Sequence, residues 1–391
     1  MAAAGIGAGD MIIGIQIGLD FNLIFVLAVI GTCILKYVLT EGIARYQLGT
    51  GRSLITAWAE DFPRLFHYLF FIFFVLWSIM VSAALMSACG IAGNALFPNF
   101  SIGTWGIIQS IITFIIIYFG RYALIEHITK WLVGLMFMMV ISTAVYLLVM
   151  IQPDPLVLSI PIEYSRNTLL FAILGGVGGS VTVLSYGYWL REKGWNSREN
   201  LDVVRFDLTF SYFITGFFVL SVMYIASVLQ VDGNTLTGSA MVLGVADMVG
   251  DIMGPLGAFI FKLGFWGVVF SSMITVWSGV PYIFSDFIHR QRKIVVEGDS
   301  AIHTTSLPYR IYLLFMTIIP MILTVWLDAV RNVINYTLIS TVFVFGLAVT
   351  LLYLNSRYET LGDIRNGWLT NVLLVLTILS FAVMTINTLI S

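Results

Sequence analysis

The stretch that decides the fold of this chain is Gly175-Gly176-Val177-Gly178-Gly179-Ser180. It interrupts an apolar segment, and each glycine inside a helix weakens that helix by about 1 kcal/mol relative to alanine. A second glycine-rich stretch, Gly5-Ile6-Gly7-Ala8-Gly9-Asp10, interrupts the first apolar segment about half a chain earlier. In a bilayer, backbone leaves a helix only where it lines a cavity or packs against protein. Matching interruptions in the two halves therefore predict the binding site of a transporter.

Close packing of helices is the alternative explanation of these glycines. Small residues let helices approach closely in membranes, and Gly14 and Gly18 have the GxxxG spacing that is typical of such contacts. A phosphate-binding loop is excluded, because neither interruption follows a strand in a βαβ unit. The sequence alone leaves the binding-site and packing explanations open.

Composition predicts an all-α, polytopic membrane protein. Hydrophobic residues make up 59% and charged residues 10% of the 391 positions, against about 45–50% and 25% in soluble domains. Nucleic-acid partners are not expected because no run of Lys and Arg exists. Cys33 and Cys89 lie in apolar segments without CxxC spacing and are interpreted as small core residues. An enzyme is not expected, because the sequence has no HExxH motif and no Ser/His/Asp set at membrane depth. No cofactor is expected either.

Windows of about 20 apolar residues predict a series of membrane spans. The full spans are expected near 22–44, 68–97, 103–119, 131–150, 167–190, 206–230, 255–282, 309–327, 333–354 and 367–390, and residues 5–19 add a short one. We divide them into a first repeat, 1–150, a second repeat, 166–354, and an eleventh helix, 367–390. Because each repeat holds an odd number of spans, the two repeats are expected to have inverted topology.

The loops predict the orientation. Arg and Lys concentrate in alternate loops, which are therefore expected on the cytoplasmic side. This places the N-terminus inside and the C-terminus outside, and we expect the inner (plasma) membrane of a bacterium. The largest outer loop, 231–254, carries three acidic residues and no cation. This acidic loop is interpreted as a solvated surface rather than as a cation-attracting one.

Motifs along the chain resemble one transporter family. Gly7-Ala8-Gly9-Asp10, then Ile15-Gln16-Ile17-Gly18, then Gly49-Thr50-Gly51-Arg52 are similar to the first two helices of Nramp (natural resistance-associated macrophage protein) divalent-metal transporters, where Asp-Pro-Gly-Asn precedes Gln-x-Gly and Thr-Gly-Arg. Further likenesses are Gly120-Arg121 with Glu126, Asp207, Ser271-Ser272 and Pro320. The resemblance covers nearly the whole chain. It implies a leucine-transporter-type fold of five plus five inverted helices with an added eleventh, and coupled metal uptake into the cytoplasm.

The site positions depart from the family pattern. Gly7 stands where the family has its metal-binding Asp, and Asp10 stands where it has Asn. In the sixth span the family's Met-Pro-His-Asn corresponds to residues 179–182, so the sulfur ligand is missing, and Tyr186 replaces the next His. All four histidines fall in predicted cytoplasmic loops. The remaining oxygen ligands suit Mg²⁺, Ca²⁺ or Na⁺ better than Mn²⁺ or Fe²⁺, so the sequence leaves the ion open.

Asp10 is the main candidate residue. A carboxylate at membrane depth costs about 2.5–3.5 kcal/mol on insertion scales and is by default a functional hypothesis. The alternative is an N-cap for a helix that begins near Met11. The predicted metal ligands are Asp10 with backbone of Gly7, Gly176 and Gly179. The predicted substrate-binding set comprises Gly7, Asp10, Gln16, Gly176, Gly179, Thr182 and Tyr186.

Other polar residues at membrane depth have two interpretations each. Lys262 neutralises Asp10 or takes a cation's place, or it snorkels to the outer interface. Ser271 and Ser272 form a coupling-ion site, or they bond back to their own helix. A third group, Lys36, Glu41 and Arg45, is predicted to form an ion-pair network at the inner face, in which the last two have the favourable i, i+4 order.

The function predicted is a secondary transporter that moves a metal cation, divalent by resemblance, by alternating access, with a proton or sodium as coupling ion. The alternative is a sodium- or proton-coupled importer of a small organic solute such as an amino acid. A structural or receptor-like membrane protein is the third class. Family members have a half-helix before the first break, whereas only Met1-Ala2-Ala3-Ala4 precede Gly5. We therefore expect either an incomplete chain or a protein that works without this half-helix.

Overall fold

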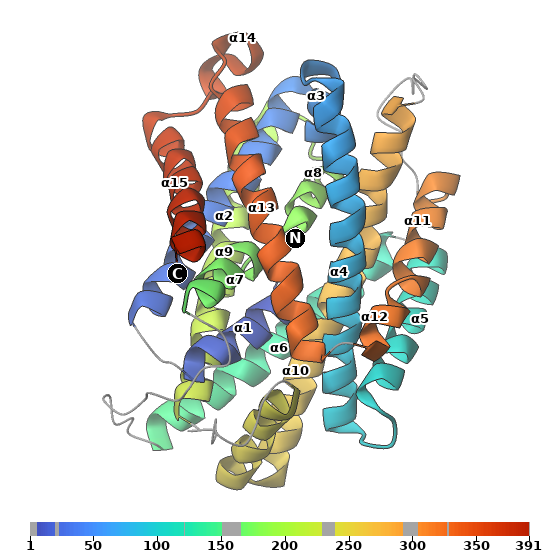
Figure 1. Ribbon diagram of the computed structural model, residues 1–391, viewed down its shortest axis with the longest axis vertical. Helices are drawn as coiled ribbons and strands as arrows, with labels where there is room; N and C mark the ends of the chain where they lie inside the picture. The colour runs from blue at the N-terminus through green and yellow to red at the C-terminus, as the bar shows by residue number, and fades with distance from the viewer. Residues whose placement is uncertain are drawn as a thin grey trace.

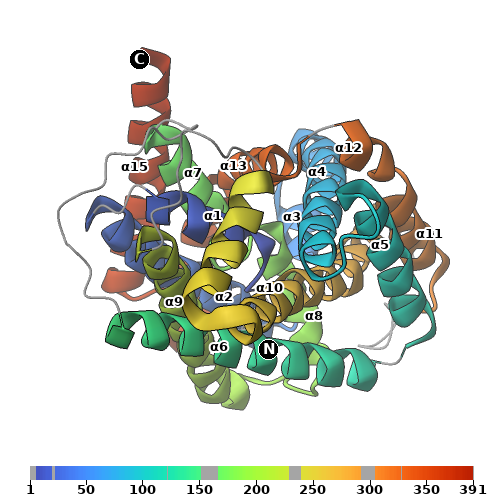
Figure 2. The same cartoon turned by 90° about the horizontal axis from the view of Figure 1, so that it is seen from below.

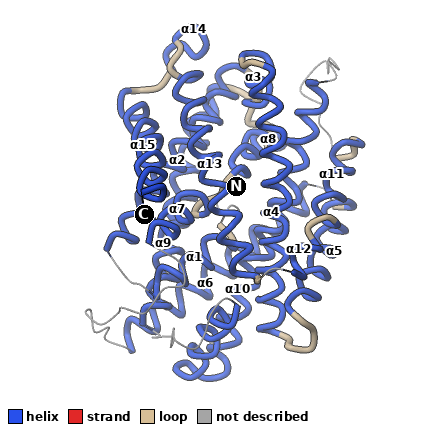
Figure 3. Tube along the Cα trace, in the orientation of Figure 1, coloured by secondary structure: helices blue, strands red, loops and turns tan. Residues whose placement is uncertain are grey.

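The computed structural model describes residues 6–19, 23–120, 122–150, 166–228, 239–291, 304–326 and 328–390. Every regular element within these ranges is a helix (Figure 3). The long helices are α2 (Leu23–Thr50), α4 (Arg64–Leu96), α5 (Ile102–Phe119), α6 (Tyr122–Met150), α9 (Leu201–Val228), α10 (Ser239–Gln291), α13 (Ala329–Asn355) and α15 (Trp368–Ile390). The shorter ones are α1 (Ala8–Leu19), α3 (Leu54–Asp61), α7 (Arg166–Gly176), α8 (Ser185–Glu192), α11 (Leu307–Ile318), α12 (Met321–Trp326) and α14 (Tyr358–Leu361).

The predicted spans correspond to these helices. Each full span overlaps one long helix or a pair separated by a short break, and the short span 5–19 corresponds to α1. Nine described helices are long and apolar enough to cross a membrane, and a tenth is reached if the bent pair Tyr358–Ile364 and Trp368–Val383 counts as one span. The prediction of an all-α, polytopic membrane architecture is confirmed.

Helix α10 corrects the prediction of an outer loop over 231–254. The helix already begins at Ser239, so the second part of that stretch is helical, while its first part lies outside the described residues. Gly254 then has a φ of 74° inside the helix and precedes Pro255. Only glycine adopts this backbone conformation readily, and proline removes a helix hydrogen bond, so α10 kinks here.

The interior of the bundle is built around α1. All residues from Ala8 to Leu19 are buried, and the helix contacts α7, α9, α10 and α13. Figure 1 shows α4 and α13 running side by side along the bundle, and Figure 2 shows α1 between α9, α7 and α10 when the molecule is seen from below. A short apolar helix enclosed by other helices is thus placed at the centre of the bundle.

The outward faces of the helices are apolar. Large side chains on four different helices, Leu27, Phe119, Phe213 and Trp368, are each more than half exposed. Soluble monomers rarely expose so much contiguous apolar surface. Acyl chains of a bilayer are the surroundings that such faces fit.

Candidate functional site

The second glycine stretch is an unwound segment between two half-helices. Helix α7 ends at Gly176, a single 3₁₀ turn covers Val181–Leu184, and α8 begins at Ser185. Gly178 and Gly179 have φ values of 71° and 89°, in the left-handed region that side chains with a Cβ atom disfavour. The predicted interruption of this span is therefore confirmed, and its cause is local backbone geometry.

Close packing fixes the end of α7. A Cβ atom added at Gly175 would lie 1.9 Å from the carbonyl oxygen of Thr337 in α13. Glycine is thus required there for contact between the helices. Gly175 thus serves packing, as the alternative explanation predicts, whereas Gly178 and Gly179 serve the unwinding.

The first glycine stretch is shorter than predicted. Ile6 and Gly7 are non-helical, whereas Ala8, Gly9 and Asp10 already belong to α1. Asp10 is therefore not the N-cap of a helix beginning near Met11. Instead its Oδ2 accepts a 2.7 Å hydrogen bond from the N–H of Gly7, which is the capping interaction of a first-turn carboxylate reaching back to the helix start.

Asp10 also joins the two unwound segments. Its Oδ1 accepts a 3.0 Å hydrogen bond from the N–H of Gly178, and the side chain is 1% exposed. The helix start packs closely on the other half, because a Cβ atom at Gly9 would lie 3.3 Å from the carbonyl oxygen of Gly176. The two breaks therefore meet in the interior of the bundle.

Lys36 of α2 approaches the same unwound segment from another side. Its Nζ donates to the carbonyl oxygen of Gly179 and, at 3.4 Å, to that of Gly175, and the side chain is 1% exposed. The prediction that Lys36 belongs to an inner-face ion-pair network is therefore wrong. The predicted ion pair between Glu41 and Arg45 is confirmed, with a distance of 3.0 Å, and Arg205 adds a further contact to Glu41 of 3.1 Å.

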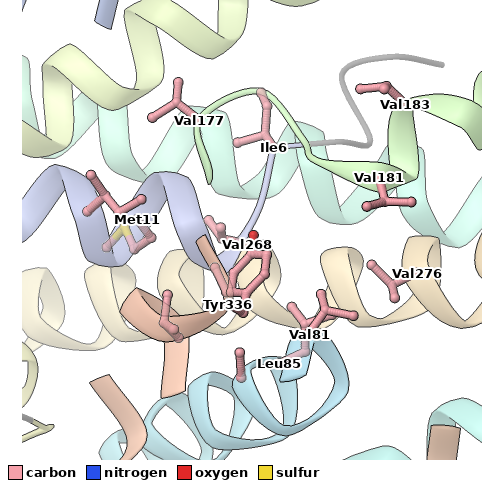
Figure 4. Close-up of a cluster of buried hydrophobic side chains, with 14 of the residues drawn as sticks. Ile6, Met11, Val81, Leu85, Val177, Val181, Val183, Val268, Val276 and Tyr336 are labelled. Carbon is pink, nitrogen blue, oxygen red and sulfur yellow. The ribbon is translucent and has the colours of Figure 1, made fainter. Parts of the chain in front are cut away.

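A small cavity lies beside the two breaks, with a volume of about 20 Å³, which is room for about one water molecule. Its lining comprises Gly7, Gly9, Asp10, Val81, Leu85, Gly176, Gly179, Ser180, Thr182, Ser272, Thr275, Val276 and Tyr336. Figure 4 shows Ile6, Val81, Leu85, Val276 and Tyr336 in one cluster of buried hydrophobic side chains, with Tyr336 between Ile6 above and Leu85 below. One carboxylate, several hydroxyls and backbone thus face a space with apolar walls.

The structure brings most of the predicted site residues together. Gly7, Asp10, Gly176, Gly179, Thr182 and Ser272 line the cavity. Gln16 is buried in α1 outside the lining. Tyr186 is also outside it and donates from its hydroxyl to Asp207 at 2.9 Å.

Two of the proposed coupling-ion residues have other partners. The Ser271 hydroxyl donates to the carbonyl of Val268 in its own helix, at 2.9 Å, so the back-bonding interpretation holds for it. Lys262 Nζ lies 3.0 Å from Asp247 Oδ1, and that carboxylate is 70% exposed. Lys262 therefore pairs with an exposed carboxylate rather than with Asp10, and the basic residue beside the breaks is Lys36.

Soft metal ligands are absent from the described lining. The described histidines lie within helices rather than in loops, which corrects that prediction: His67 in α4, His127 in α6 and His289 in α10. His303 lies outside the described residues. None of the described histidines lines the cavity, and no group of three or more His, Cys, Asp or Glu side chains in the described part could hold a metal ion.

Helix α8, which follows the unwound segment, is held by hydrogen bonds to neighbouring helices. Gln47 Nε2 donates to the carbonyl of Gly187 at 2.7 Å, and the Tyr188 hydroxyl donates to Asp286 at 2.8 Å. A third bond, of 2.9 Å, runs from the Tyr282 hydroxyl to a carboxylate oxygen of Glu192. These contacts tie α8 to α2 and α10. We call these three hydrogen bonds the α8 lock.

Sequence reasoning missed Lys36 and Tyr336 as neighbours of the site. Lys36 carried a usable signal, because an ionisable residue inside an apolar span is a functional candidate by default. Tyr336 carried none, since tyrosine is common in spans and only the packing of α13 brings it to the cavity.

Solved transporters share this fold. A variant of the manganese transporter of Eremococcus coleocola is 16% identical with a TM-score of 0.72, over 99% of this chain and 84% of that one. MhsT in complex with L-phenylalanine is 14% identical with a TM-score of 0.68, over 98% and 96%. Mhp1, a nucleobase-cation-symport-1 family transporter solved in a closed conformation with bromovinylhydantoin, is 13% identical with a TM-score of 0.59, over 98% and 90%. The fold is therefore of the leucine-transporter type.

Sequence comparison identifies the family. No curated protein matches the sequence significantly. One family model, described as natural resistance-associated macrophage protein-like, matches residues 1–391. It is the family that the motifs around Asp10 and Gly49–Arg52 resemble, and its members are transporters rather than enzymes. The chain is an integral membrane protein that belongs to the Nramp family of metal-ion transporters.

Proposed function

We propose that this protein is a secondary transporter that moves a divalent metal cation into the cytoplasm by alternating access, with the cation held beside Asp10. The observation that carries the proposal is the 3.0 Å bond between Gly178 N–H and Asp10 Oδ1. It joins the two unwound segments at the carboxylate that lines the cavity. In transporters built of inverted repeats, such a junction is where one part rocks against the other.

The chemistry of the lining supports a hard cation. Asp10, the hydroxyls of Ser180, Thr182, Ser272, Thr275 and Tyr336, and backbone carbonyls offer oxygen and no sulfur or imidazole. Oxygen ligands suit Mg²⁺ and Ca²⁺, whereas nitrogen and sulfur ligands favour later transition metals. We therefore propose a hard divalent cation, Mg²⁺ or Ca²⁺, as cargo ahead of Fe²⁺ and the later transition metals.

The size of the cavity also supports an ion. Its volume of about 20 Å³ is far below the roughly 300–1,000 Å³ of pockets that hold small organic molecules. In this closed state it can take one small ion or one water molecule. An amino acid would need the walls formed by Val81, Leu85 and Val276 to move apart.

The transport cycle that we propose opens the α8 lock on the cytoplasmic side. This proposal includes two inverted repeats, 1–150 and 166–354. It also includes a cytoplasmic N-terminus, an outer C-terminus and a location in the plasma membrane. Coupling to a proton is proposed at Asp10, because it is the acidic side chain in the lining. Helix α8 would then swing away from α2 and α10, breaking the bond between Tyr188 and Asp286.

Flux into proteoliposomes tests the proposal. We expect uptake of Mg²⁺ or Ca²⁺ by the wild-type protein, with acidification of the lumen if protons are co-transported. Asp10→Asn should abolish uptake, because the amide carries no charge and cannot accept both N–H bonds. Asp247→Asn is the matched control, since that carboxylate is exposed and paired with Lys262, and it should keep full uptake. Equal uptake by the two variants would reject Asp10 as the site.

An importer of a small organic solute is the second candidate. It is favoured by the missing soft ligands and by Lys36, whose ammonium already contacts the unwound backbone. MhsT, which has a similar fold, was solved with L-phenylalanine. Uptake of amino acids with no flux of any metal ion would establish this candidate and exclude metal transport. Absence of any flux would instead point to a structural or receptor-like role.

A further inference from the structure

The carbonyl groups of the second break form a cradle for a positive charge. The last carbonyls of a helix have no partner within that helix, and the aligned peptide dipoles make this end negative. Gly175 lies in the last turn of α7, and Gly179 lies in the unwound segment that follows. Both carbonyl oxygens accept from Lys36 Nζ. Their natural ligand, a cation, is thus supplied by the chain itself.

The N–H groups of the two breaks also bind a charged side chain of the chain itself. Asp10 accepts from the N–H groups of Gly7 and Gly178. In transporters of this architecture, the positive ends of half-helices face anionic substrate groups, and unwound carbonyls coordinate cations. Here the Asp10 carboxylate takes the place of an anionic substrate group, and the Lys36 ammonium takes the place of a coordinated cation.

Lys36 is held firmly in this position. A Cβ atom at Gly178 would lie 3.7 Å from Lys36 Cβ, so the unwound segment rests on the lysine stem. One turn further along α2, Thr40 shares a 2.6 Å hydrogen bond with the Tyr212 hydroxyl. The same hydroxyl donates to the carbonyl of Gly178 at 3.4 Å. Donors from α2 and α9 therefore face three carbonyls of the break.

We propose that the Lys36 ammonium is a built-in cation that occupies the carbonyl cradle, so that an incoming cation gains these oxygens only when the ammonium leaves them. The two cations compete for the same acceptors, since an oxygen that accepts from an ammonium cannot also bind a metal closely. Lys36 would then set cation affinity and selectivity from outside the cavity lining. This inference rests on the proposed function only in naming a metal ion as the competitor.

Cation binding by purified variants tests the inference. Lys36→Met keeps a similar length but removes the charge, whereas Lys36→Arg keeps the charge. We would measure dissociation constants for Mg²⁺, Ca²⁺ and Na⁺ by titration calorimetry, with thermal shift as a second readout. Lys36→Met should bind at least one of these ions about tenfold more tightly than wild type or better, which corresponds to about 1.4 kcal/mol. Lys36→Arg should bind no more tightly than wild type.

Equal or weaker cation binding by Lys36→Met would overturn the inference, as would a matching gain in Lys36→Arg. If Lys36→Met does not fold, hydrogen exchange of the wild-type peptide 173–184 decides. Saturating cation should change exchange in this peptide as the ammonium leaves, and unchanged exchange would reject displacement.

Flux separates this inference from the proposed function. Tighter binding by Lys36→Met without any wild-type metal flux would support the cradle and reject metal transport. Wild-type metal flux without tighter binding by Lys36→Met would support metal transport and reject the cradle.

Discussion

Gly175→Ala should destabilise the protein strongly, because the added methyl group has no space between α7 and α13. Its carbon would lie 1.9 Å from the carbonyl oxygen of Thr337 and 2.4 Å from Thr341 Oγ1. Ordinary contacts of a Cβ atom begin near 3.4 Å, so the helices must separate by roughly 1.5 Å, the difference between these distances. Overpacking of a core costs about 1–3 kcal/mol, and more where backbone rather than a flexible side chain must move.

Gly346→Ala in α13 is the matched control. A Cβ atom at Gly346 meets nothing within 4 Å, and replacing a helical glycine by alanine stabilises by about 0.5–1 kcal/mol. We therefore expect the free energies of unfolding of the two variants to differ by about 1.5–4 kcal/mol, the sum of the two effects. The assay is unfolding in detergent followed by circular dichroism, with metal uptake in proteoliposomes as a second measurement. Equal stability of the two variants would refute the packing argument.

Three further predictions concern buried and exposed charges. Asp286→Ala should lower the free energy of unfolding by about 2–4 kcal/mol, since two hydroxyl groups and Arg290 lose their buried acceptor. Denaturant titration measures this change, and a loss below about 1 kcal/mol would contradict the prediction. Glu41→Gln should lower the free energy of unfolding by about 3–5 kcal/mol, because Arg45 remains buried without its counter-charge. A melting temperature equal to that of the wild type would contradict a stabilising role of this ion pair. Lys262→Gln should change stability by at most about 1 kcal/mol, because its partner is exposed, and it should leave metal uptake unchanged; lost uptake would restore Lys262 as a site residue.

Local sequence properties determined the architecture. In lipid, the backbone must satisfy its own hydrogen bonds, so an apolar run of spanning length has to be a helix. This is why the predicted spans coincide with helices such as α4 and α13. The glycines at 178 and 179 marked the unwound segment for an equally local reason, since their positive φ values suit no other residue.

The loop predicted over 231–254 is wrong where a less apolar segment forms a helix that packs on the bundle. Residues 239–253 fall between two windows of apolar residues, which predicts a loop, yet they form the first part of α10. Val242, Val245 and Val249 of this segment are buried, so the helix is stabilised by packing against the rest of the protein. Propensity and hydropathy do not register such contacts.

The sequence by itself determined a helical membrane protein with two glycine breaks, its family, and a single strong candidate carboxylate. Only the tertiary structure decided what the charges at the breaks bind. Asp10 meets Gly178 across 168 positions and Lys36 meets Gly175 across 139. Partners so far apart in the chain are chosen by how α1, α2 and α7 pack together, and no local pattern contains that information.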